Sequence, residues 1–170
     1  MKSLSTVIGV ALLALSLSAM AEEAKPAAGA ATATPAAAPA EMGTEAEAQA
    51  MSEKAATLVD EKGEAAFETF KAKDGGFQDK DLYVFCMDDK GKMLSHALKQ
   101  DLVGTDMLNF DKYGDKPFQK MVDTAMGAEG KGWVDYKWPL PGGTEPQDKK
   151  SYVIKNSKGF FCGVGAYVKK

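Results

Sequence analysis

The side chains most often used for catalysis and metal binding are few in this sequence. It has one histidine, His96, and two cysteines, Cys86 and Cys162, which are too far apart to form a CxxC redox motif. A single histidine cannot complete a multi-histidine metal site, and no Gly-x-Ser-x-Gly nucleophile elbow is present. The sequence therefore predicts no catalytic residues, no metal and no cofactor, and we expect that the protein is not an enzyme.

The first 21 residues have the features of a signal peptide. Lys2 provides a short positive region, residues 4–17 are apolar, and Ala19-Met20-Ala21 fits the small-x-small cleavage pattern. The alternative is a retained membrane anchor, but the apolar stretch is shorter than the roughly 20 residues that a spanning helix needs. We expect cleavage near Ala21 and a periplasmic product without membrane insertion.

The rest of the chain divides into a linker and one domain. Residues 22–43 are rich in alanine and proline and cannot bury enough apolar surface to fold, so they read as a disordered linker. Residues 44–170 have the size of one ordinary domain. Loss of Lys2 takes the formal charge from -3 to about -4, which argues against nucleic acid or an anionic membrane as a partner.

The domain begins with the pattern of a long amphipathic helix. Thr44 and Glu47 form a capping box, and apolar residues follow at helical spacing, with Gly63 marking a bend or break. Strand-forming runs then follow, separated by turn residues, and Pro117 begins a short second helix. The expected strands are residues 82–87, 93–96, 133–138, 151–155 and 160–168. This order predicts an α+β domain with one antiparallel sheet.

Several motifs resemble, in order and spacing, those of the bacterial single Cache domain family. They cover residues 46–170 and are Gly63-Glu64-Ala65-Ala66-Phe67, Asp81-Leu82-Tyr83-Val84-Phe85, His96, Leu102-Val103-Gly104, residues 132–139, residues 150–153 and residues 163–167. The resemblance implies a PAS-like sheet of five or six antiparallel strands. It also implies a long N-terminal helix and a short helix over a ligand pocket.

By the same resemblance, a small-molecule pocket would be lined by His96, Trp133, Tyr136, Trp138, Lys150 and Tyr152. A lysine charge, hydroxyl and ring N–H donors, and aromatic faces suit a small carboxylate. Trp133 and Trp138 point to opposite faces of a regular strand, so one of them belongs to the core instead. Lysines are usually solvated, and a single histidine at a strand end is often a capping residue.

The two cysteines leave two interpretations open. In the implied PAS-like topology the first and last strands are central neighbours, which would bring Cys86 and Cys162 close enough for a disulfide. An even pair of cysteines in an exported protein favours such a bond. The alternative is two buried free thiols that act as small hydrophobic side chains.

Members of this family usually form the sensing part of chemoreceptors and histidine kinases and bind small organic acids. This sequence ends at Lys170, after the last expected strand. We therefore expect a stand-alone periplasmic sensor-type protein that binds a small carboxylate and acts with a membrane receptor, histidine kinase or transporter. The alternative is a ligand-free interaction module that forms a homodimer through its N-terminal helix.

Overall fold

The computed structural model describes residues 41–168. The expected signal peptide, residues 1–21, lies outside the described residues, as does the expected linker, residues 22–43, except for its last three positions. Among those three, Gly43 is buried, and its backbone N–H donates to the buried carboxylate of Asp81. In the described part of the chain, no helix is long and apolar enough to cross a membrane.

The first helix, α1 (Glu45–Lys62), begins at the capping box that the sequence predicts. The Thr44 side chain accepts the N–H of Glu47, and the Glu47 side chain accepts the N–H of Thr44. The helix ends at Gly63, whose φ of 59° lies in the left-handed region that glycine adopts without strain. One turn of 3₁₀ helix, η1 (Gly63–Ala65), then leads into α2 (Ala66–Lys71), so the predicted break at Gly63 is confirmed.

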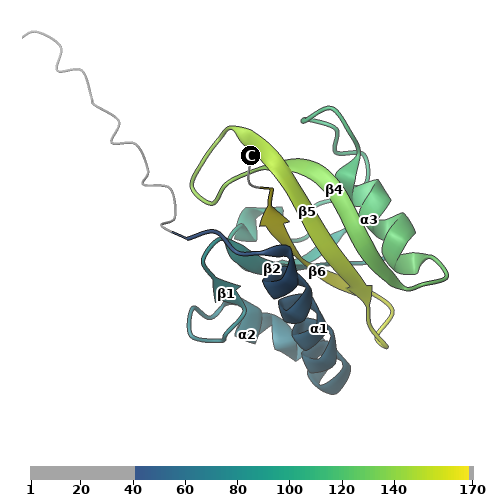
Figure 1. The fold of residues 1–170 in the computed structure, drawn as a ribbon. Helices are drawn as coiled ribbons and strands as arrows, with labels where there is room; N and C mark the ends of the chain where they lie inside the picture. Colours follow the sequence, from purple (N-terminus) through teal and green to yellow (C-terminus); the bar gives the residue numbers. More distant parts are fainter. Residues whose placement is uncertain (1–40, 169–170) are drawn as a thin grey trace, which may run out of the picture. The chain divides into compact units, whose positions relative to one another are not determined.

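Six antiparallel strands form one sheet in which β2 and β6 occupy the centre (Figure 1). The order is β1-β2-β6-β5-β4, and β3 pairs with β2 on the same edge as β1. The strands are β1 (Gln78–Asp79), β2 (Leu82–Met87), β3 (Met93–His96), β4 (Lys131–Pro139), β5 (Pro146–Lys155) and β6 (Phe161–Tyr167). The predicted α+β fold with a single antiparallel sheet is confirmed.

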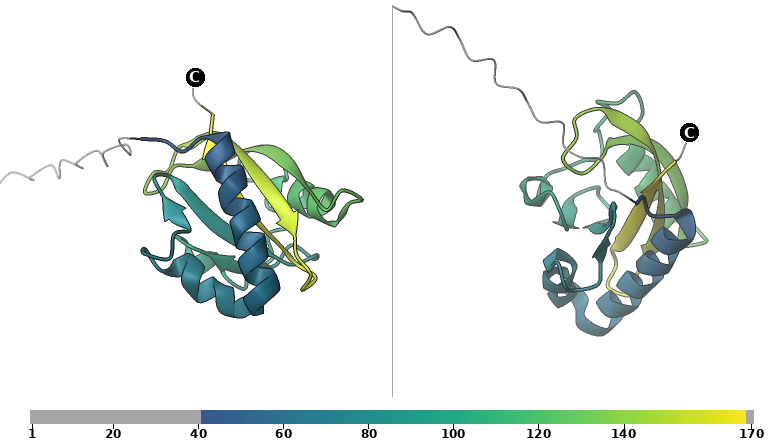
Figure 2. Two further views of the ribbon diagram at one scale, coloured as in Figure 1. Left: turned by 60° about the horizontal axis from the view of Figure 1, so that its bottom comes forward. Right: turned by 60° about the vertical axis from the view of Figure 1, so that its left-hand side comes forward.

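Helices cover the two faces of the sheet separately (Figure 2). Buried residues of α1 and α2 pack with Val84, Cys162 and Val164, while α3 (Pro117–Met126) packs with residues of the opposite face, including Val134 and Val153. Between β3 and α3 lies a long connection that contains a short 3₁₀ helix, η2 (Gln100–Leu102). The sheet therefore has a face toward α1 and a face toward α3, and each has its own hydrophobic cluster.

Strand β5 is longer than the sequence indicates. The analysis of apolar patterns places its start at Ser151, but the strand begins at Pro146 and pairs with β4 over its whole length. Its first half is polar and follows a loop rich in glycine and proline, so no hydrophobic alternation marks it. The early start brings Lys149 and Lys150 into the sheet, where their side chains must point to opposite faces.

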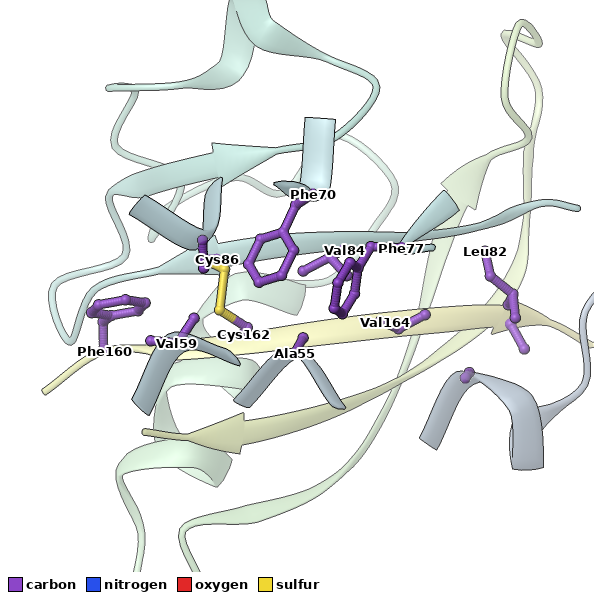
Figure 3. Packing of buried hydrophobic residues seen from close by; sticks show 13 residues of the cluster. Ala55, Val59, Phe70, Phe77, Leu82, Val84, Cys86, Phe160, Cys162 and Val164 are labelled. Atoms are coloured by element: carbon purple, nitrogen blue, oxygen red, sulfur yellow. A yellow bond between two sulfur atoms is a disulfide. The ribbon is translucent and has the colours of Figure 1, made fainter. Parts of the chain in front are cut away.

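A disulfide joins Cys86 of β2 to Cys162 of β6 at directly paired positions of the two central strands. Both residues are fully buried on the α1 face. Figure 3 shows the sulfur–sulfur bond close to Phe70 and to Val59 of α1. Between the two interpretations of the cysteines, the structure has the bonded form.

Replacing both cysteines by alanine should lower the free energy of unfolding by about 2–4 kcal/mol, because the bond closes a long loop in the unfolded chain. Urea unfolding of the two proteins measures the difference. Reductant should lower the stability of the parent protein to that of the double variant and leave the variant unchanged. Equal stability of parent and variant without reductant would contradict the assignment.

Candidate functional site

The register of β4 and β5 decides which of the expected ligand residues can meet. Tyr136 is paired with Lys149, and Trp133 is paired with Tyr152. Because side chains alternate along a strand, Tyr136 shares its face with Trp138, and Tyr152 shares its face with Lys150. The six expected residues are therefore divided between the two faces of the sheet.

Three of the six, Trp133, Lys150 and Tyr152, lie on the α1 face. The Lys150 Nζ forms an ion pair with Glu45 at 3.1 Å and lies 5.5 Å from the ring centre of Trp133. The Tyr152 ring packs on Trp133 at 5.0 Å, and its backbone carbonyl accepts the Ser52 hydroxyl. These contacts attach α1 to the sheet, so the structure does not bring these three residues into a common pocket with His96.

The other three, His96, Tyr136 and Trp138, lie together on the α3 face. Trp138 packs against the rings of Phe110, Tyr113 and Phe118 at 5.6–5.9 Å. Beside it remains a cavity of about 10 Å³, the size of a single water molecule. Its walls are Tyr83, Phe85, Met93, His96, Phe118, Tyr136 and Trp138.

A larger hollow of about 310 Å³ adjoins this inner cavity. Tyr83 and His96 border both spaces, and their rings lie 4.9 Å apart. The remaining walls of the outer hollow come from the segment after β3, the last residue of β4 and the loop that follows it, and are Leu98, Lys99, Pro139, Pro141 and Gly142. Tyr83 and His96 thus stand at the boundary between the two spaces.

A buried lysine, Lys149, lies behind this boundary. It is 1% exposed, its Nζ donates to the Tyr83 hydroxyl at 2.9 Å, and the same atom lies 4.1 Å and 4.3 Å from the ring centres of Tyr83 and Tyr167. Burial lowers the pKa of Lys149 to about 7, while the charge of Asp81 acts in the opposite direction. The resemblance led to Lys150 instead. The register with Tyr136 is the signal that selects Lys149, but β5 was expected to begin only after it.

The tyrosine hydroxyls around Lys149 stay protonated and form hydrogen bonds with one another or with neighbouring residues. Burial raises the pKa of Tyr83 and of Tyr136 well above the usual value, so both stay protonated. Tyr136 shares a hydrogen bond with Ser151 at 2.9 Å. Tyr83 accepts a hydrogen bond from the Lys149 ammonium group, and its own O–H donates to the Tyr167 hydroxyl, so it joins β5, β2 and β6 in one buried network.

His96 is held as a neutral donor. Its Nδ1 accepts the backbone N–H groups of Leu98 and Lys99 at 3.2 Å and 3.0 Å, so the ring proton is on Nε2. Burial, together with the positive charges of Lys149 and Lys99, lowers the pKa of His96 to about 3. A ring that stays neutral and accepts at Nδ1 offers one N–H at the edge of both spaces.

This arrangement suits anion recognition better than acid–base or metal chemistry. It combines a buried ammonium group with hydroxyl and imidazole donors, and apolar rings line the rest of the inner cavity. Within the described range, no group of three or more His, Cys, Asp or Glu side chains could hold a metal ion.

Comparisons with known proteins point in the same direction. The Cache domain family model matches residues 44–170. The methyl-accepting chemotaxis protein McpP of Pseudomonas putida KT2440 is 35% identical over 92 residues, which are 53% of this chain and only 17% of that receptor.

Two solved structures are also similar to the chain. A periplasmic sensor domain of a chemotaxis protein has a TM-score of 0.57 and 32% identity, covering 71% of this chain and 87% of that one. A Cache chemosensory domain, described for its carboxylic acid recognition, has a TM-score of 0.58 and 28% identity, covering 71% and 88%.

The tautomer of His96 can be tested directly, because the sequence contains a single histidine. ¹⁵N NMR of the ring should show a neutral, Nε2-protonated imidazole from pH 8 down to about pH 4, with protonation only near pH 3. A titration near the ordinary value of 6.5, or an Nδ1-protonated ring, would contradict this placement.

Proposed function

The chain belongs to the Cache domain family, and on that premise we propose that it is a periplasmic sensor-type protein that binds a small organic carboxylate on the α3 face of its sheet. We place the ligand at the boundary formed by Tyr83 and His96. In this proposal Lys149 provides the positive charge. Of the six ligand residues expected from the sequence, three remain in the proposed site: His96, Tyr136 and Trp138.

The observation that carries this proposal is the buried ammonium group of Lys149. A buried positive charge without a full counter-ion is costly, and the burial is reflected in its lowered pKa. A bound anion restores the missing charge complement. The hydrogen bond that Lys149 donates to Tyr83 holds the positive charge directly behind the boundary, although Lys149 lines neither space.

The shapes of the two spaces indicate how a carboxylate would sit. The outer hollow of about 310 Å³ is large enough for a small metabolite, with Lys99 at its wall. The inner cavity of about 10 Å³ is apolar around Met93, Phe118 and Trp138. In this arrangement the carboxylate lies in the outer hollow, where it accepts from the Nε2–H of His96 near Lys99, and no more than a terminal methyl group enters the inner space.

The relatives support the biological setting of the proposal. The matched proteins include chemotaxis receptors and a Cache domain known for carboxylic acid recognition. We propose that this chain is exported, with cleavage near Ala21, and that its loaded form acts with a membrane receptor, histidine kinase or transporter. Because the alignment spans a small part of McpP, the partner rests on the proposal alone.

Binding can be tested by thermal shift and calorimetry with straight-chain monocarboxylates of increasing length, using residues 22–170. A binder held at 100 times its dissociation constant should add about 2.7 kcal/mol of stability. Lys149→Met and Tyr83→Phe should each weaken binding by tenfold or more, because the first removes the positive charge and the second removes the hydroxyl that holds it. Lys150→Met is the matched control, since this neighbouring lysine pairs with Glu45 on the opposite face.

Two results would contradict the proposal. If Lys150→Met abolishes binding and Lys149→Met does not, the ligand lies on the α1 face. If no carboxylate shifts a well-folded protein, a ligand-free interaction module that dimerises through α1 becomes the better interpretation.

The pH dependence of binding provides a separate test. The folded-state pKa of Lys149 is lowered, so the lysine loses its charge as the pH rises through about 7. Tyr83 and Tyr136 stay protonated in this range and His96 stays neutral. The dissociation constant should therefore rise by up to about tenfold for each pH unit from 7 to 9. Calorimetry across this range measures it, and a constant affinity would exclude Lys149 as the group that attracts the anion.

A further inference from the structure

Strand β6 separates Lys149 from the group it holds. Lys149 is on β5 and Tyr83 is on β2, and the sheet order places β6 between them. Neighbouring strands are about 4.8 Å apart, so the lysine side chain has to pass over the backbone of β6 to reach Tyr83. The register shows where it crosses, because Gly165 pairs with Ser151 on one side and follows Val164, the partner of Val84, on the other.

Gly165 leaves the space that this crossing needs. A Cβ atom at position 165 would lie 2.6 Å from Cε of Lys149 and 2.4 Å from Oγ of Ser151, both far inside ordinary contact distance. The φ of Gly165 does not lie in the left-handed region. The φ of Gly159, in the turn before β6, does. Glycine is therefore required here for room rather than for backbone conformation.

We propose that Gly165 is the positioning residue of the ligand site: the absence of a side chain there lets Lys149 cross β6 to hold the Tyr83 hydroxyl and lets Ser151 hold Tyr136. Its effect on ligand binding rests on the proposed function. Its effect on the placement of Lys149 does not, because every contact involved is within the protein.

Gly163 provides a matched control on the same strand and the same face. A Cβ atom there would lie 2.9 Å from the Phe85 ring and 2.9 Å from a Val153 methyl group, and 3.1 Å from the Tyr152 carbonyl oxygen. The crowding would be of similar severity, but it would not involve Lys149. A difference between the two alanine variants therefore separates the positioning of the lysine from general damage to the sheet.

The first experiment measures the pKa of Lys149 by NMR of protein with ¹³C-labelled lysine, without any ligand. The parent protein and Gly163→Ala should show an ε-carbon that titrates near 7. In Gly165→Ala the displaced ammonium group gains water, so its pKa should rise by at least one unit toward the ordinary value of lysine. An unchanged titration in Gly165→Ala would overturn the proposal.

The second experiment is a double-mutant cycle that measures melting temperatures. It remains informative if Gly165→Ala is too unstable for the NMR titration. Lys149→Ala removes the Cε atom that the new methyl group would meet. The drop in melting temperature caused by Gly165→Ala should therefore be smaller in the Lys149→Ala background than in the parent protein, by roughly 3 °C at least. The cost of Gly163→Ala should not depend on Lys149. If Lys149→Ala relieves neither substitution, or relieves both equally, Gly165 is not specific to the lysine.

Carboxylate binding then separates this inference from the proposed function. Gly165→Ala should weaken binding by tenfold or more, whereas Gly163→Ala is the control only for the pKa and stability measurements, because Phe85 borders the inner cavity. If the parent protein binds no carboxylate but the Lys149 pKa moves in Gly165→Ala, the positioning role stands and the ligand proposal fails. If the parent protein binds and Gly165→Ala binds equally well, the positioning role fails instead.

Discussion

The burial of one ammonium group constrains the centre of this molecule. Lys149 is 1% exposed, and a charge so far from water needs compensation from its neighbours. This compensation comes from the rings of Tyr83 on β2 and Tyr167 on β6, from the Tyr83 hydroxyl, and from the charge of Asp81 in the turn before β2. Three strands must therefore keep their register for the charge to be tolerated. The Cys86–Cys162 bond ties two of those strands together at paired positions on the opposite face.

The two faces of the sheet have distinct tasks that share the same strands. On the α1 face, the disulfide joins two central strands, and the Lys150–Glu45 ion pair and the Ser52–Tyr152 hydrogen bond attach the long helix. On the α3 face, the same strands present Lys149 and Ser151 to a polar network beside two spaces. Adjacent residues of β5 thus alternate between the α1 face and the α3 face, so a shift of one residue along the strand exchanges their surroundings.

The elements of the fold could be predicted because their signals are local. The capping box at Thr44, the break at Gly63 and the apolar run of β2 follow from spacing and backbone preference, and all three are found where expected. The opposite orientation of Trp133 and Trp138 also follows from strand alternation. The resemblance to the Cache family added the sheet topology, which local patterns cannot supply.

The site could be predicted only in part because it depends on register. The structure brings His96, Tyr136 and Trp138 to one cavity, whereas Lys150 lies on the other face and the buried lysine on this face is its neighbour Lys149. Nothing in the residues before Ser151 distinguishes a buried lysine from a solvated one. The sequence places Tyr83 in a strand but does not mark it as part of a site, because an apolar run does not show which of its members borders a cavity.

The lowered pKa of Lys149 has a consequence for how the proposed sensor would bind its ligand. Because burial lowers the pKa of Lys149 to about 7, neutral and charged forms of the lysine coexist around that pH, and a carboxylate binds better to the charged form. Binding of the carboxylate then raises the fraction of Lys149 that is protonated. The protein therefore takes up the carboxylate and a proton together, and the two have the same composition as the uncharged acid. His96 cannot supply that proton, because it is already neutral. The proton must come from solvent, and the occupancy of the site therefore depends on both the ligand concentration and the acidity of the compartment.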